Sequence, residues 1–248
     1  MVKALFLSVI IAFIFSYKAY SEVVINGTRI VFHAQDKEAV VQLKNTGKNP
    51  YLVQMWLDKG DPNARPGEVT VPFVVNPPVV RIDPEKGQAI RLMMTGGQLP
   101  QDRETLFWFN LLEVPPKATA MIQSGNNVLQ MAFRTRVKLL YRPDKLHPSP
   151  VEVYKALRFS ISGDKLTLTN DSPYFITFSK LEIRKSKNST ILARVEHFDQ
   201  RMVAPEGKIE FILKAVTDHP LYGETLFYSV INDYGGESVN EQVLGNNI

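Results

Sequence analysis

Short runs of β-type residues separated by turn sequences make up most of this chain, and this alternation limits the folds it can adopt. The runs span residues 23–32, 39–44, 51–57, 79–82, 89–94, 106–114 and 128–140, then 157–161, 165–169, 175–183, 209–213 and 226–232. The breaks between them contain Pro, Gly and Asn, the residues that favour turns. No segment has the apolar spacing of a helix of three turns. The pattern therefore predicts an all-β fold of antiparallel sandwiches.

A proline-rich stretch divides the β-type runs into two groups. Pro143, Pro148 and Pro150 fall within eight residues, and each proline removes a backbone donor and stiffens the chain. We therefore expect a linker at residues 144–150, between an N-terminal domain at 22–143 and a C-terminal domain at 151–248. Each domain would have the ordinary size of a β-sandwich.

The first 21 residues resemble a secretory signal rather than part of the fold. Lys3 is followed by an apolar run at 4–15, which is shorter than the roughly 20 residues needed to span a bilayer. Ala19 and Ser21 supply small residues for cleavage before Glu22. The expected mature chain loses two lysines and no acidic residue, so the formal net charge of +4 falls by two. A mildly basic exported chain gives no support for nucleic-acid binding.

The residues that usually carry catalysis or bind metals are scarce. The sequence has no cysteine, which excludes thiol nucleophiles, cysteine-based metal sites and disulfides, and which in an exported chain fits a bacterial envelope. Its four histidines are scattered, and it has no Gly-rich phosphate loop or Gly-x-Ser-x-Gly elbow. Asp102 and Glu104 could form an acid–base pair, but charged residues beside a strand are usually solvated or ion-paired. We predict a protein that is not an enzyme, with no catalytic residue, metal or cofactor.

Residues 127–138 have the clearest two-sided pattern. Apolar and polar side chains alternate along this run, with Leu129, Met131, Phe133 and Val137 on one face and Gln130, Arg134, Arg136 and Lys138 on the other. One interpretation is an ordinary half-buried strand of the chain's own sandwich. The other is an edge strand that docks a partner by β-augmentation, in which main-chain hydrogen bonds give affinity and alternate side chains enter pockets.

Several segments resemble the signatures of PapD-like periplasmic pilus chaperones. They occur in the family's order, at Thr28-Arg29, 50–56, 102–110, 127–130, 138–143 and 231–236. The resemblance covers the expected mature chain and thins between residues 181 and 221. It implies two immunoglobulin-like β-sandwich domains in an L-shaped arrangement. It also implies a chaperone that binds, folds and caps pilus subunits by donor-strand complementation, lending a strand to a subunit whose own sandwich lacks one.

The same resemblance implies roles for particular residues. Leu129, Met131 and Phe133 would enter the open groove of the subunit. Arg29 and Lys138 would bind the subunit's C-terminal carboxylate between the domains, which would fix the register of the added strand. Without the resemblance, these two cations would be interpreted as solvated charges on strands that never meet. On a regular strand Lys138 also faces away from Met131, so either a bulge or twist reorients it or the carboxylate lies at the side of the strand.

Other residues match structural positions of the family. Glu104, Arg142 and Asp233 match an interdomain charge network that would set the angle between the domains, although a surface ion pair alone contributes little. Pro50 and Pro77 match prolines that cover the donor strand in some free relatives. For these prolines, turn formation is the simpler interpretation.

The stretch between Pro116 and Asn127 is short and lacks cysteine, which resembles the short-loop branch of the family. The resemblance implies a periplasmic chaperone that delivers pilus subunits to an outer-membrane usher without a cofactor, and it leaves open self-association through the donor edge. The alternatives are a pilus subunit or a carbohydrate-binding β-sandwich protein, and after them an envelope hydrolase. A subunit would have one incomplete domain, and a sugar site would have clustered aromatics with carboxylates. Neither pattern is evident.

Overall fold

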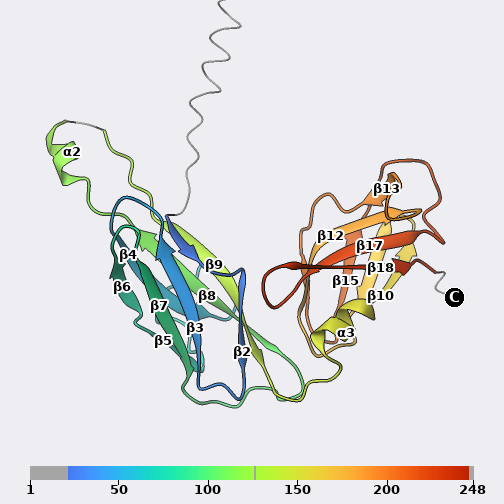
Figure 1. Ribbon diagram of the computed structural model, residues 1–248, viewed down its shortest axis with the longest axis horizontal. Helices are drawn as coiled ribbons and strands as arrows, with labels where there is room; N and C mark the ends of the chain where they lie inside the picture. Colours follow the sequence, from blue (N-terminus) through green and yellow to red (C-terminus); the bar gives the residue numbers. More distant parts are fainter. Residues whose placement is uncertain (1–21, 126, 246–248) are drawn as a thin grey trace, which may run out of the picture.

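The strands of the molecule form two sandwiches, as the sequence predicts (Figure 1). The structure is a computed structural model that describes residues 22–125 and 127–245. The expected signal segment at 1–21 lies outside the described residues. No helix in the part of the chain that the structure describes is long and apolar enough to cross a membrane.

The N-terminal sandwich packs a four-stranded sheet against a five-stranded sheet. The first has the order β1-β3-β7-β5, with β1 (Val23–Ile25), β3 (Glu38–Asn45), β7 (Gly87–Met94) and β5 (Phe73–Asn76). The second has the order β2-β9-β8-β4-β6, with β2 (Arg29–His33), β9 (Phe133–Arg142), β8 (Thr105–Val114), β4 (Tyr51–Asp58) and β6 (Val79–Ile82). Phe32, Phe109 and Leu139 are fully buried between the sheets, because alternate residues of each strand face inward.

The C-terminal sandwich has a three-stranded and a six-stranded sheet. The smaller sheet contains β10 (Arg158–Ser162), β11 (Lys165–Thr169) and β15 (Lys208–Ile212). The larger has the order β16-β13-β12-β17-β18, with β16 (Lys214–Ala215), β13 (Ile191–Arg194), β12 (Ile176–Arg184), β17 (Thr225–Ile231) and β18 (Glu237–Val243). The two-residue strand β14 (Met202–Val203) pairs with β12. The rings of Phe159, Phe178 and Tyr228 meet in the core.

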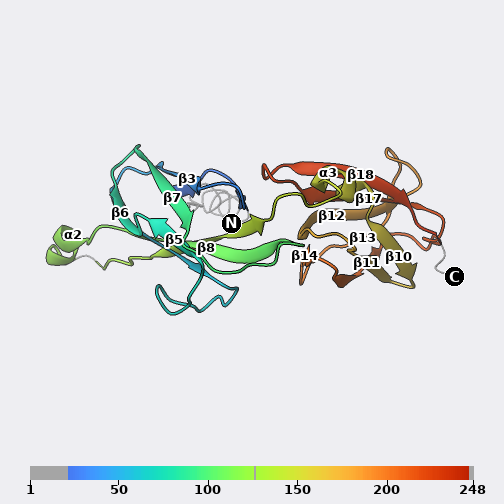
Figure 2. The same ribbon diagram turned by 90° about the horizontal axis from the view of Figure 1, so that it is seen from below.

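The two sandwiches diverge from a common junction, as expected for the L-shaped arrangement (Figure 1). Figure 2 shows them side by side without overlap, with the short helix α2 (Thr119–Gln123) at the far end of the N-terminal lobe. A second short helix, α3 (Pro150–Lys155), follows the proline-rich stretch. These helices have five and six residues, too few for an apolar period to appear in the sequence.

The run predicted at 23–32 is two strands in different sheets. β1 pairs with β3 in an antiparallel manner, whereas β2 pairs with β9 in a parallel manner. The chain crosses between the sheets at residues 26–28, where Gly27 has a φ of 126°. Only glycine adopts such a backbone conformation readily. The crossing brings Arg29 into the same sheet as β9.

The run predicted at 128–140 is wrong at its start, because β9 begins at Phe133. The pairing of β8 with β9 ends at Glu113 opposite Phe133. Val114 is followed by Pro115 and Pro116, and proline has no backbone N–H to continue a ladder. Residues 127–132 therefore precede the strand without regular secondary structure.

Candidate functional site

Strand β9 has one edge that is open over its first half. On one side, β8 pairs with it from Phe133 to Tyr141. On the other side, β2 pairs with it only from Lys138 to Arg142. Among the described strands none pairs with this second side between Phe133 and Val137. The open edge is a row of backbone groups able to accept a further strand.

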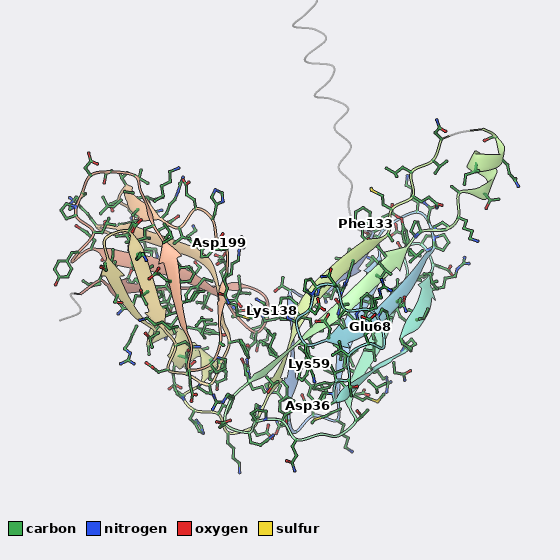
Figure 3. All side chains as sticks on the ribbon, turned by 180° about the vertical axis from the view of Figure 1, so that it is seen from behind. Asp36, Lys59, Glu68, Phe133, Lys138 and Asp199 are labelled. Atoms are coloured by element: carbon green, nitrogen blue, oxygen red, sulfur yellow. The ribbon has the colours of Figure 1, made fainter. Side chains whose placement is uncertain are left out.

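The segment that leads into this edge carries exposed apolar side chains. Leu129 is 84% exposed and Met131 is 48% exposed, and Phe133, the first residue of β9, is partly buried. The Gln130 side chain donates a hydrogen bond to the Pro116 carbonyl at 2.6 Å. Figure 3 shows Phe133 near the outer end of the strand and Lys138 closer to the junction between the lobes. The structure thus leaves Leu129 and Met131 outside the core of their own domain.

Arg29 and Lys138 are brought together where the open edge ends. They are direct register partners in the parallel pair of β2 and β9, so their side chains lie on the same face of the sheet. The interpretation as charges on strands that never meet is therefore wrong. The register between β8 and β9 has no shift, so no bulge turns Lys138 toward the core face of Val137.

Both cations are partly buried, and neither forms an ion pair with an acidic side chain among the described residues, although the charges of Asp233 and Glu104 act on Arg29. Burial lowers the pKa of the Arg29 guanidinium, and its Nε is buried with no hydrogen-bond partner in the described structure. Burial, and then the charges of Arg29 and Arg201, lower the pKa of Lys138 to about 8. A bound anion would favour the charged forms of both groups. The pair is therefore suited to hold a carboxylate.

The sequence did not identify two residues of the C-terminal domain that lie at this site. Thr177, on β12, accepts a hydrogen bond from Lys138 Nζ at 3.0 Å. Arg201 precedes β14, and its backbone oxygen accepts the Phe178 N–H at 2.8 Å, next to the pairing of Thr177 with Met202. Arg201 comes from the region where the sequence resemblance is thin and Thr177 lies just before that region, so neither belongs to a segment that carried the resemblance.

The outward face of β9 is occupied by contacts within the chain. Asp58 is fully buried and receives the Arg136 guanidinium at 2.8 Å. Arg136 also lies 4.7 Å from the ring centre of Trp108, and Arg134 lies 4.6 Å from that of Trp56. These ion-pair and cation–π contacts hold the strand rigid from this side. The parts of this strand that remain available to a partner are its open edge and residues 127–132 before it.

Glu104, Arg142 and Asp233 form a continuous network across the domain junction. Arg142 donates to Glu104 at 2.7 Å and to both oxygens of Asp233 at 2.6 and 2.8 Å. The other Glu104 oxygen accepts the Phe175 N–H at 2.8 Å. Burial raises the pKa of the Glu104 carboxyl. For Asp233, burial acts to raise the pKa, but the hydrogen bonds and charge of Arg142, together with the charges of Arg29 and His33, outweigh it and the pKa is lowered.

The arrangement offers no acid–base pair. Glu104 is committed to Arg142 and Phe175, whereas Asp102 faces solvent and pairs with Arg103 at 2.8 Å. Residues 22–125 and 127–245 contain no group of three potential metal ligands. The chemistry that the site supports is strand addition together with carboxylate binding.

The two prolines lie at different places in the five-stranded sheet. Pro50 lines a shallow groove of about 230 Å³ with Leu52, Val114 and Pro116, at the end of the sheet where residues 127–132 begin. Pro77 precedes β6, and β4 and β8 lie between that strand and β9. The segment that carries Leu129, Met131 and Phe133 is called the donor segment, after its predicted role. That Pro50 and Pro77 cover this segment in the free chain stays a prediction.

Two family models together match almost all of the described chain. The model described as "Pili and flagellar-assembly chaperone, PapD N-terminal domain" matches residues 22–147. The model described as "Pili assembly chaperone PapD, C-terminal domain" matches residues 152–242.

Similar proteins with curated names are chaperones. The probable fimbrial chaperone YadV of Escherichia coli is 43% identical over 90% of this chain and 89% of its own length. The chaperone protein MrkB of Klebsiella pneumoniae is 37% identical over 91% of this chain and 93% of its own. A crystal structure of YadV aligns with a TM-score of 0.73 at 38% identity, covering 90% of this chain and all of that one. The Salmonella enterica SafB chaperone, solved in complex with the SafA pilin, aligns with a TM-score of 0.72 at 27% identity, covering 92% and 99%.

Proposed function

The chain belongs to the PapD family of pilus-assembly chaperones, and from this premise we propose that it holds a pilus subunit along the open edge of β9. It is a chaperone and not an enzyme. A neighbour of known structure, SafB, was solved with a pilin bound. The proposal concerns which residues of this chain hold the subunit.

The subunit would add a strand to the edge at Phe133–Val137 and to the segment before it. Main-chain hydrogen bonds would supply part of the affinity. Leu129, Met131 and Phe133 would fill the groove that the subunit's missing strand leaves open. Burying each of these side chains contributes roughly 1.5 to 3 kcal/mol. Because residues 127–132 have no regular structure in the free chain, they would become a strand on binding.

Arg29 and Lys138 would bind the C-terminal carboxylate of the subunit. The added strand must stop at Arg29, because β2 occupies the edge beyond that residue. A strand that ends there with its carboxyl group runs toward the junction, as β9 does, and is therefore parallel to β9. The carboxylate would lie at the side of β9 between the two cations, so Lys138 need not face the same way as Met131. This end stop would fix the register.

The position of the paired cations at the end of the open edge is the observation that carries the proposal. The test is co-expression with the pilus subunit encoded beside the chaperone, followed by purification of the complex. The unmodified chaperone should retain the subunit, and the double variant Arg29→Ala, Lys138→Ala should lose it. Normal recovery with the double variant would overturn the anchor.

The remaining steps concern export and delivery. We infer that cleavage before Glu22 releases the chain into the periplasm, and that the loaded chaperone passes its subunit to an outer-membrane usher. Exchange of the lent strand for one from the next subunit would provide the driving force. Free molecules would associate through the same edge, because an open apolar edge favours strand pairing. The network of Glu104, Arg142 and Asp233 would hold the two domains at the angle that binding requires.

A further inference from the structure

A buried carboxylate on β8 contacts the first residue of β1 and has no cationic side chain beside it. Glu113, on β8, is 1% exposed and lies on the core-facing side of the strand with Leu111. Its Oε2 accepts the Val23 N–H at 2.8 Å. Its Oε1 is buried and has no hydrogen-bond partner in the described residues. No Lys, Arg or His side chain of the described chain forms an ion pair with it.

The neighbouring groups add negative charge rather than neutralise it. The Glu22 side chain has a buried oxygen, Oε2, that is also unpartnered within the described residues. The pKa of Tyr51 is raised to about 12 by burial, by a hydrogen bond with Glu22 and by the charges of Glu22 and Glu113. Two carboxylates thus share this site without a basic side chain. Burying carboxylates is costly unless a cation accompanies them.

The backbone of Glu22 is held beside this carboxylate. Its carbonyl accepts hydrogen bonds from the Thr46 N–H at 2.8 Å and the Thr46 hydroxyl at 3.1 Å. A side chain at Gly47 would collide with Glu22, so glycine at that position leaves the space that Glu22 fills. Standard bond lengths place the nitrogen of one residue roughly 3 Å from that of the next. Because the Val23 N–H donates to Glu113, the Glu22 nitrogen lies one residue along the chain from this carboxylate.

We propose that Glu113 is the binding site for the α-ammonium group that cleavage before Glu22 creates. Hydrolysis of the bond between Ser21 and Glu22 consumes one water, leaves a carboxylate on the released leader and gives Glu22 an amine that takes up a proton. Before cleavage this nitrogen is a neutral amide. After cleavage it would form a buried ion pair with Glu113, which fastens β1 to β8.

The location links this site to the donor edge. Glu113 is the register partner of Phe133, the first residue of β9. The proposed ion pair would therefore anchor the mature N-terminus under the outer end of the donor strand. The inference rests on the processing proposed above and does not require subunit binding, so its tests use the chaperone alone.

The first test compares four proteins in thermal unfolding. Two begin at Glu22, one with a free α-amino group and one with that group acetylated, and each is made with and without Glu113→Gln. Intact mass of the exported protein establishes the first residue. We expect Glu113→Gln to lower the melting temperature of the free-terminus protein by about 3 °C and not to lower that of the acetylated protein, in which the carboxylate has no cation to lose. The exposed Glu68→Gln serves as the control and should affect neither.

A second measurement needs no substitution. The α-amino group of the unmodified protein should react with an acylating reagent more slowly in buffer than in urea, because the ion pair raises its pKa above the ordinary value of about 8. Equal reactivity in the two conditions would overturn the proposal. So would equal effects of Glu113→Gln on the free and acetylated proteins, or an exported chain whose first residue is not Glu22.

Discussion

Arg29 on β2 and Lys138 on β9 are register partners in a parallel strand pair, at the point where the open edge of β9 ends. Because β2 occupies the edge of β9 from Lys138 onward, no added strand can extend further toward the junction. The same pairing places two cations on one face of the sheet. A guest strand that follows this edge would meet positive charge at its last residue. In the proposed complex, parallel pairing of β2 with β9 would therefore set the length limit of the guest strand and provide its anchor.

Removal of either anchor cation should weaken subunit binding without unfolding the chaperone. Charge-assisted hydrogen bonds contribute about 1.5 to 3 kcal/mol, so Arg29→Ala or Lys138→Ala should weaken binding by roughly 10- to 100-fold. The melting temperature should change little for Arg29→Ala, because Arg29 forms no ion pair within the described chain and the charges of Asp233 and Glu104 act on it only at longer range. Titration calorimetry with purified subunit measures the first effect. Arg81→Ala, which breaks only an exposed ion pair, is the control and should bind normally.

Subunit affinity should fall as the pH rises above about 8. Lys138 has a pKa of about 8 in the free chaperone, lowered by burial and then by Arg29 and Arg201. A bound carboxylate would raise that pKa, so the complex holds the proton more tightly. The contribution of Lys138 is then fully present below the free-state pKa and is lost as the pH rises through the bound-state pKa. Dissociation constants across this range measure it, and a flat profile would contradict the assigned role.

A charge in the donor segment should prevent subunit binding while leaving stability unchanged. Met131→Asp places a carboxylate in the apolar groove of the subunit, and the desolvation of that carboxylate has a large free-energy cost. Leu129 and Met131 are already exposed in the free chain, so the unfolding free energy should stay the same. Ile122→Asp changes an isoleucine that is 59% exposed outside the segment and should not affect binding. Retention of a co-expressed subunit by Met131→Asp would contradict the donor assignment.

Loss of the central residue of the interdomain network should destabilise the protein strongly. Arg142→Ala leaves the Glu104 side chain, which is fully buried, without its cation, at a cost of about 3 to 5 kcal/mol. Urea unfolding measures this cost. Arg103→Ala removes another interdomain ion pair, with Glu206, whose members are exposed, and should cost much less than Arg142→Ala because solvent screens an exposed pair. Equal losses in the two variants would show that burial of Glu104 is not decisive.

Local patterns in the sequence predict the architecture well. Turn residues between short alternating runs indicate two β-sandwiches, and the structure confirms them. The start of β9 was not predicted, because alternation continues through Leu129 and Met131 although the partner strand ends before two prolines. The start of β9 depends on where its partner β8 ends. The alternation of residues 127–138 contains no information about the end of β8.

The strand content, the alternation of residues 127–138 and the resemblance to the family can all be read from the amino-acid sequence. Those features are local, since turn chemistry and side-chain period act between near neighbours. The three-dimensional fold was needed to see that Arg29 meets Lys138, that Thr177 lies against this lysine and that Glu113 is buried without a side-chain cation. Each of these depends on which distant strands pair and in what register, and long-range packing sets that choice.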